Sequence, residues 1–292
     1  MRFLLLAVLI CCSCLMQAQQ QSLDTTTLTY RLFRSSERYA VNPLVSVPLI
    51  VGGAIGSQRR LLFLQDKTEI TASELALLDP DDVPGIDRIA LRRNFDAHKE
   101  ALIQSDYFFN TGQWAPFGLF LWKKYRRDWF DISLMYLEAQ VTQGLFYGFA
   151  PFGPTSVDRY RPTVYYDEGN PDSRVDGNNK NSLFSGHVST MSTGFYFMAR
   201  MIDDYNPQLS GAQRALIYTG FTLPSLVGGW LRIKGLKHYP TDVAVGLGVG
   251  AISGIGVPSL HKWWKQRHPR SRMSLRPVYG GGAAGLAFGL QY

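Results

Sequence analysis

The chain has little cysteine, little histidine and a low proportion of charged residues. Its three cysteines are Cys11, Cys12 and Cys14, so a chain cleaved beyond them would hold no disulfide, thiol nucleophile or cysteine metal site. Charged residues make up 18% of the 292 residues, whereas hydrophobic residues make up 46%. This composition excludes a disordered polymer, a collagen and a coiled coil, and it allows a large core.

The positive charge lies in short clusters. The net charge of +7 comes from 30 Lys and Arg against 23 Asp and Glu, with clusters at residues 123–127 and 262–276. No zinc-finger spacing or aromatic RNA-binding motif accompanies them, so we expect no nucleic-acid partner. In a chain with apolar segments, such clusters are typical of a membrane face.

The N-terminus has the pattern of a secretory signal. Arg2 precedes an apolar run over residues 3–16, which is followed by the small Ala18 and the polar Gln19. The run is shorter than the ~20 residues that a spanning helix needs. We therefore predict a signal peptide over residues 1–18 and an exported protein. Acylation of one of the three cysteines, as in a lipoprotein, is an alternative.

Six apolar segments follow the leader and predict an all-α bundle of about six helices. They comprise residues 43–55, 114–122, 132–152, 185–205, 215–230 and 243–257, the last continuing toward residue 264. The last segment is rich in glycine, which allows close helix packing. The number of membrane crossings stays open, because the second segment is short and the third carries polar residues.

These segments suggest a division of the chain. We expect an N-terminal arm, the first apolar helix and an acidic connector over residues 19–110, a functional core over 111–264, and a basic, Gly-rich tail over 265–292. Apolar residues alternate from Leu286 to Tyr292, as in the closing strand of an outer-membrane barrel. One strand cannot form a barrel, so a short β-like tail is the preferred interpretation.

Three polar motifs lie between the apolar segments. They are Arg161-Pro162, Phe184-Ser185-Gly186-His187, and the spaced set Arg232, His238 and Asp242. His238 and Asp242 stand four residues apart, which puts them on one face of a helix. A carboxylate bonded to one ring nitrogen leaves the other free as a nucleophile or base. Taken singly, each of these residues is more often structural.

The second motif begins an apolar segment, where free amides and the helix dipole favour an anion. Gly186 lets the backbone approach that anion, and His187 could protonate a leaving oxygen while His238 attacks. Two histidines, two arginines and a helix N-terminus predict a phosphate site that requires no metal. We expect the other three histidines at the surface; they are His98, His261 and His268.

Together the motifs resemble the type 2 phosphatidic acid phosphatase superfamily, which also contains acid phosphatases and vanadium haloperoxidases. Its members share a lysine, six residues and Arg-Pro; then Pro-Ser-Gly-His; then Ser-Arg, five residues, His, three residues and Asp. Here the last block runs from Leu231 to Asp242 with its spacing intact. The resemblance covers roughly residues 110–260.

The resemblance implies a metal-independent phosphatase that works without a cofactor through a phosphohistidine. His238, oriented by Asp242, would attack phosphorus, and His187 would act as the general acid. The groups implied to hold the phosphate oxygens are Arg161, Ser185, Gly186 and Arg232.

The sequence departs from the family pattern at three positions. Pro154 stands where the lysine is expected, Phe184 replaces a proline, and Leu231 replaces a serine. Lys180 or Arg159 could supply the missing cation.

The expected substrate is a phosphorylated lipid or polyprenyl diphosphate, reached from a membrane. We expect the active site on the periplasmic side, because the basic clusters favour the cytoplasm. A cleaved leader would give the opposite orientation if all six segments cross. The alternatives are a soluble periplasmic acid phosphatase acting on small phosphomonoesters, a vanadate haloperoxidase, and a non-catalytic envelope protein that keeps the fold.

Overall fold

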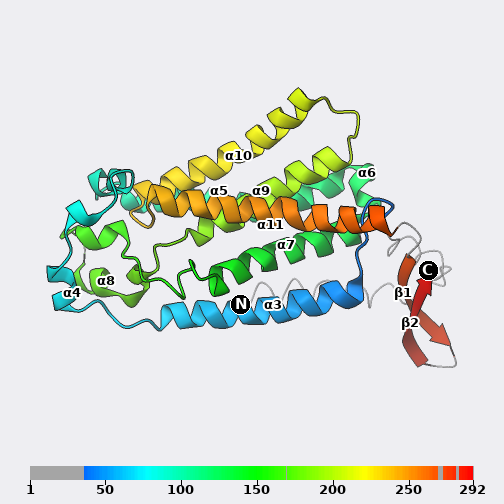
Figure 1. The fold of residues 1–292 in the computed structure, drawn as a ribbon, viewed down its shortest axis with the longest axis horizontal. Coiled ribbons are helices and arrows are strands. Elements are labelled where there is room, and N and C mark those ends of the chain that lie inside the picture. The colour runs from blue at the N-terminus through cyan, green and yellow to red at the C-terminus, as the bar shows by residue number, and fades with distance from the viewer. Residues whose placement is uncertain (1–35, 169, 269–271, 281–282, 292) are drawn as a thin grey trace. The chain divides into compact units, whose positions relative to one another are not determined.

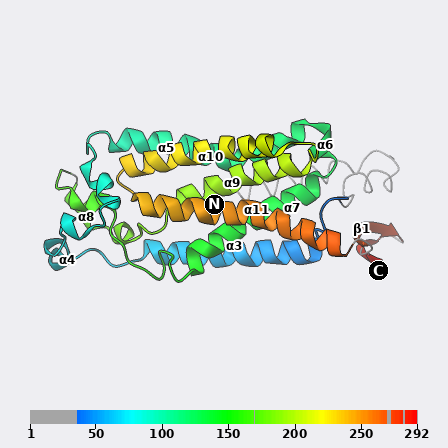
Figure 2. The ribbon, with the colours of Figure 1, turned by 45° about the horizontal axis from the view of Figure 1, so that its top comes forward.

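The computed structural model describes residues 36–168, 170–268, 272–280 and 283–291. Within residues 36–268, long helices run side by side, as Figures 1 and 2 show. The predicted all-α bundle is therefore confirmed. The predicted signal peptide, residues 1–18, lies outside the described residues.

Six long helices build the bundle. They are α3 (Pro43–Gln65), α5 (His98–Trp114), α7 (Trp129–Phe149), α9 (Gly186–Asp204), α10 (Gly211–Lys234) and α11 (Pro240–Arg267). Short α-helical turns are α4 (Ala72–Ala76), α6 (Lys123–Arg126) and α8 (Pro171–Val175). The 3-10 turns are η2 (Pro80–Asp82), η3 (Asp87–Arg92), η4 (Ala115–Leu121), η5 (Pro162–Tyr165) and η6 (Gly177–Lys180).

Two of the expected apolar segments differ from the observed helices. The second forms the 3-10 turn η4 instead of a long helix, since Pro116 lacks the N–H that continues a helical ladder. The first continues to Gln65, because Arg59 is exposed and Arg60 stacks over the ring of Phe149 at 4.6 Å. Basic residues on an outward face do not end a helix.

Helix α9 packs against α5, α7, α10 and α11. Its contact with α11 depends on a stripe of glycines four residues apart. A Cβ added at Gly246, Gly250 or Gly254 would come within 3.0 Å of a carbonyl oxygen of α9. The two backbones therefore lie in close contact, as the glycine-rich pattern predicts. Gly246 faces the carbonyl of Ser185, so this packing brings the first turns of both helices together.

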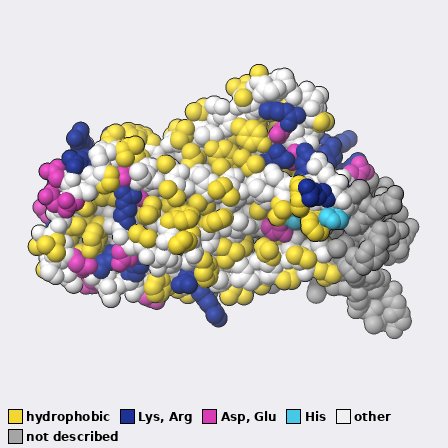
Figure 3. Space-filling model, viewed as in Figure 1, with side chains coloured by type: hydrophobic (Ala, Val, Ile, Leu, Met, Phe, Trp, Pro, Cys, Tyr) yellow, Lys and Arg dark blue, Asp and Glu magenta, His cyan; other side chains and the backbone are white. Residues whose placement is uncertain are grey.

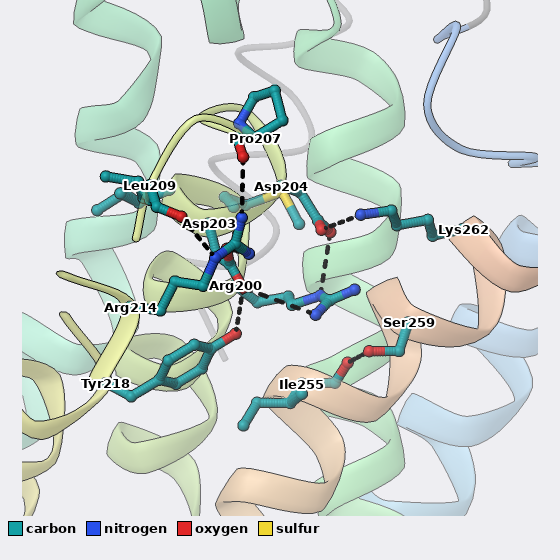
Figure 4. A network of polar contacts seen from close by, with 12 residues as sticks. Arg200, Asp203, Asp204, Pro207, Leu209, Arg214, Tyr218, Ile255, Ser259 and Lys262 are labelled. Atoms are coloured by element: carbon teal, nitrogen blue, oxygen red, sulfur yellow. Dashed lines mark hydrogen bonds and ion pairs between the residues drawn. The ribbon is translucent and has the colours of Figure 1, made fainter. Parts of the chain in front are cut away.

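The other end of α9 is fastened by buried ion pairs, drawn in Figure 4. Asp203 pairs with Arg214 of α10, and Asp204 lies 2.6 Å from Nζ of Lys262 of α11. Tyr218 also points toward Asp203, with its hydroxyl 3.4 Å from the carboxylate. These contacts join three helices at the end opposite to the motifs.

Two of the histidines expected at the surface are half-buried. His261 lies 2.5 Å from Oε2 of Glu138, across α11 and α7, and His98 stacks on Phe95. His268 is exposed, as expected. The neighbours of His261 in the sequence are basic, so the sequence alone did not predict its contact with the carboxylate of Glu138 on another helix.

The C-terminal strands form a separate unit. β1 (Arg272–Gly280) pairs with β2 (Ala283–Gln291) in one antiparallel hairpin, with Arg272 opposite Gln291. Among the described helices, α11 alone is long and apolar enough to cross a membrane by length and composition.

Candidate active site

The structure brings the three motifs together at one end of the bundle. Arg161 precedes η5, Arg232 lies in the last turn of α10, and His238 comes just before α11. Main-chain hydrogen bonds join these segments directly. Ser185 N–H donates to the carbonyl of Asp242 at 3.1 Å, and Thr163 N–H donates to that of Leu236 at 3.1 Å.

His238 is buried and has one hydrogen-bond partner among the described residues. Its Nδ1 lies 2.7 Å from the carbonyl oxygen of Ser182. A carbonyl only accepts, so Nδ1 carries the proton and Nε2 keeps its lone pair. Burial and the charges of Arg232 and Arg161 lower the pKa of His238 well below its ordinary value. The ring is therefore neutral and holds a free basic nitrogen.

Asp242 does not bond His238 directly, contrary to the expectation from their spacing. Its Oδ2 lies 3.9 Å from Nδ1, too far for a hydrogen bond. Instead, Oδ2 accepts from Ser182 Oγ at 2.6 Å and from Tyr239 N–H at 2.8 Å. Asp242 therefore fixes Ser182, and the carbonyl of Ser182 fixes His238.

A buried ion-pair clamp holds this arrangement. Arg159 donates to Asp242 and, at 2.6 Å, to Asp87. Asp87 also accepts from the backbone N–H and hydroxyl of Thr241, at 2.9 and 2.7 Å. The guanidinium of Arg159 is thus bound by two buried carboxylates, and its role as the replacement for the missing lysine stays a prediction. Nothing in the acidic stretch around Asp87 signals this contact from sequence.

Arg161 and Arg232 are buried and poorly paired. The Nε atom of each has no hydrogen-bond partner among the described residues. Their closest polar contacts, Asn178 for Arg161 and Ser105 for Arg232, are both 3.4 Å away. Burial lowers the pKa of Arg161. Two buried guanidinium groups without a close carboxylate leave donors for an anion from outside the chain.

His187 lies in the first turn of α9, half-buried beside the ring of Phe109. Its Nε2 is 3.5 Å from Oδ1 of Asp106 on α5. Burial and the charges of Arg232, Arg161 and Lys237 lower the pKa of His187 to about 3. The ring is therefore neutral in this state, since burial and the three cations disfavour its charged form.

Ser185 and Gly186 form the N-terminus of α9. The Ser185 hydroxyl accepts from Val188 N–H at 3.4 Å and caps the helix. A Cβ on Gly186 would lie 2.9 Å from the ring of Tyr147. Glycine is therefore required by the close approach of α7 to the N-terminus of α9, where free amides and the helix dipole favour an anion.

The two substitutes considered for the family lysine are engaged elsewhere. Nζ of Lys180 lies 3.0 Å from Oε1 of Glu74, in the capping box that begins α4. At position 154 the proline offers only its carbonyl, which accepts from Lys67 at 2.7 Å. Lys237, which the sequence did not single out, is electrostatically coupled to Arg161 and Arg232. In the sequence, the position of Lys237 directly before His238 could have marked it as a residue of the site.

No group of three or more His, Cys, Asp and Glu side chains that could hold a metal ion occurs within the described part of the chain. In comparisons with known proteins, residues 132–266 match the model of the PAP2 superfamily. No curated protein and no solved structure matches the chain. The match contains all three motifs, which the fold gathers at one end of the bundle. Residues 132–266 of this chain are therefore similar to the PAP2 superfamily, which supports the resemblance to the type 2 phosphatidic acid phosphatases.

Proposed function

We propose that the protein is a phosphatase that hydrolyses a phosphate or diphosphate ester of a lipid or polyprenyl carrier. The match of residues 132–266 to the PAP2 superfamily supports phosphatase activity on phosphate esters in general. The observation that carries the mechanism is the neutral, buried ring of His238, with Nε2 free, beside two guanidinium groups that lack close partners.

The first step forms a bond between Nε2 of His238 and phosphorus and breaks the bond from phosphorus to the ester oxygen. His187 gives its proton to the departing alkoxide. Burial and the charges of Arg232, Arg161 and Lys237 lower the pKa of His187, and the negative charge of the bound phosphate raises it again. His187 is thus protonated when substrate is bound and can act as a general acid.

In the second step water attacks the phosphohistidine. His187, now neutral, takes a proton from the water as the new oxygen–phosphorus bond forms, and the bond to Nε2 breaks. Phosphate leaves, and His238 returns to its neutral form. Arg161, Arg232 and the first amides of α9 hold the equatorial oxygens, where charge builds in both transition states.

A lipid substrate is favoured by the surface near this end of the bundle. Large apolar side chains are exposed on the half of α10 that leads to Arg232, including Leu223, Leu226 and Trp230. Figure 3 shows hydrophobic side chains over much of the face it draws. Exposed apolar area of this extent is typical of contact with lipid. α11 is the candidate for a membrane crossing.

The test is phosphate release from phosphatidic acid, undecaprenyl diphosphate and p-nitrophenyl phosphate by the detergent-solubilised protein. We expect release from the lipid substrates. His238→Ala should lower it at least about a thousandfold, since it removes the nucleophile. His268→Ala, which changes an exposed histidine, is the control and should act as the parent does.

The rival functions give different results in the same experiment. Hydrolysis of p-nitrophenyl phosphate alone would indicate an acid phosphatase for small esters. Bromide oxidation that needs added vanadate would indicate a haloperoxidase. The proposal would be overturned if the parent released no phosphate in any assay, or if His238→Ala released as much phosphate as the parent.

A further inference from the structure

Lys237 lies in the turn that links α10 to α11, directly before His238. Its backbone N–H donates to the carbonyl of Arg232 at 3.1 Å. Leu236, one residue earlier, is fully buried and has a φ of 56°, in the left-handed region that is unusual outside glycine. Such a backbone persists only where its surroundings hold it, so the turn fixes the backbone of Lys237 directly before His238 and against the carbonyl of Arg232.

The Lys237 side chain is half-buried and has no hydrogen bond or ion pair with the residues that the structure describes. Burial and the charges of Arg161 and Arg232 lower the pKa of Lys237 to about 8, and Asp176 opposes this shift. Lys237 in turn lowers the pKa of His187. The ammonium therefore stands among the groups of the site and faces two like charges.

The missing partner of this cluster is an anion. Arg161 and Arg232 each have an unpaired buried Nε, and Lys237 adds a third positive charge beside them. The carboxylate of Asp106 lies 4.0 Å from the guanidinium of Arg232, and the Asp106 side chain is 55% exposed. Asp176 and Asp242 also act on Arg161, but among the described residues no carboxylate forms a close hydrogen bond with Arg161, Arg232 or Lys237.

We propose that Lys237 is a phosphate-binding residue that completes a three-cation cradle with Arg161 and Arg232, in place of a cation at position 154. This proposal rests on the proposed function and narrows its substrate class. Three cations match the dianionic phosphate of a monoester or the terminal phosphate of a diphosphate. A phosphodiester carries one charge and presents fewer free oxygens, so it should bind poorly.

The test compares Lys237→Met, Lys237→Arg and the control Lys234→Met. Lys234 lies one turn earlier and lines a different surface cavity with Arg92 and Arg93. We expect Lys237→Met to raise both KM for p-nitrophenyl phosphate and Ki for orthovanadate by about tenfold or more, since a charge-assisted bond is lost. Lys237→Arg should stay within about threefold of the parent, and Lys234→Met should not differ from it.

The pH profile separates a binding role from a structural one. Lys237 is cationic below about pH 8, so kcat/KM should fall as the pH rises through that value. The charged and titratable groups that act on it are Arg161, Arg232, Asp176 and His187. Lys237→Arg should move this alkaline limb to higher pH, because a guanidinium keeps its proton. A residue that only shaped the turn would leave the limb in place.

Values of KM and Ki within twofold of the parent for Lys237→Met would overturn the proposal. If the parent hydrolyses no substrate, the proposed function fails by itself. Orthovanadate should then still raise the Tm of the parent and not that of Lys237→Met. Equal Tm shifts in the two proteins would overturn the three-cation cradle.

Discussion

At the scale of single residues, the site is organised through main-chain atoms. The carbonyl of Ser182 selects the tautomer of His238, and Asp242 acts on the ring only by holding Ser182 and the N–H of Tyr239. A carboxylate placed in this way orients the nucleophile without sharing its proton. It contributes to turnover and makes no contact with the phosphate oxygens in the proposed mechanism.

We therefore expect Asp242→Asn to lower kcat about ten- to hundredfold, in the range of other residues that orient a reactive group. KM and the Ki for orthovanadate should stay within about threefold, because Arg161, Arg232 and Lys237 are untouched. Steady-state kinetics with p-nitrophenyl phosphate measure both effects.

The matched control is Asp203→Asn, a buried carboxylate at the far end of α9, about 25 Å from His187 along the helix. It should leave kcat unchanged in protein that remains folded. An Asp242→Asn variant with parental kcat, or with vanadate affinity lost in step with kcat, would contradict the positioning role.

Much of the site could be predicted from sequence because its residues occupy the ends of helices. The spacing of Arg232, His238 and Asp242 and the N-cap at Ser185 place those groups near one another once the helices pack. Ser182 could not be predicted, since its contribution is a carbonyl that every residue possesses. Asp87 lies 72 residues before Arg159 along the chain, and no local pattern marks such a contact.

At the scale of elements, one buried ion-pair clamp joins three segments that lie far apart along the chain. Asp87 begins η3, Arg159 lies in the loop after α7, and Thr241 and Asp242 form the first turn of α11. Asp87 is 1% exposed, so its charge is compensated by Arg159 and the two hydrogen bonds from Thr241.

Asp87→Asn should destabilise the protein by about 1.5–3 kcal/mol, because Arg159 loses one of its two buried carboxylate partners and keeps only Asp242. The expected readout is a fall in Tm measured by scanning fluorimetry in detergent. Asp81→Asn is the control from the same stretch. Asp81 pairs with Arg88 at 3.1 Å, but its side chain is 85% exposed, so its loss should cost less than about 1 kcal/mol. Equal falls in Tm for the two variants would show that the buried clamp stabilises the protein no more than the exposed ion pair does.

The helices themselves were predictable where apolar residues run without interruption, as in α7, α9, α10 and α11. α5 escaped prediction because polar residues such as Gln104, Asp106 and Asn110 interrupt its apolar side chains. α5 is stabilised by packing against α9 and α10, and its own hydrophobic pattern is too weak to predict a helix. Ser105 and Asp106 of this helix contact Arg232, so the least predictable long helix also borders the site.

At the scale of the whole bundle, the two ends differ in chemistry. The motifs lie at the end where α9 and α11 begin, and the basic residues within 123–127 and 262–267 lie at the end where α6 and the last turn of α11 stand (Figures 1 and 2). α11 has 28 residues, about 42 Å of helix, enough to cross a hydrocarbon layer of about 30 Å. We infer that the basic end faces the cytoplasm and the motif end the periplasm.

A cleaved leader would favour the reverse orientation, since Ala40 N–H bonds to the carbonyl of His261 and so ties the start of the described chain to the basic end. The two signals can be separated with single cysteines in a background where Cys11, Cys12 and Cys14 are serine. Ser156→Cys lies at the motif end and Gln266→Cys at the basic end, and both positions are exposed.

We expect a membrane-impermeant maleimide to label Ser156→Cys in intact cells and Gln266→Cys only after permeabilisation. The reverse pattern would put the site in the cytoplasm and make the leader the dominant signal. Labelling of both in intact cells would mean that α11 does not cross the membrane. In that case the exposed apolar side chains would have to contact the membrane from one side, and the substrate would reach His238 from the bilayer surface.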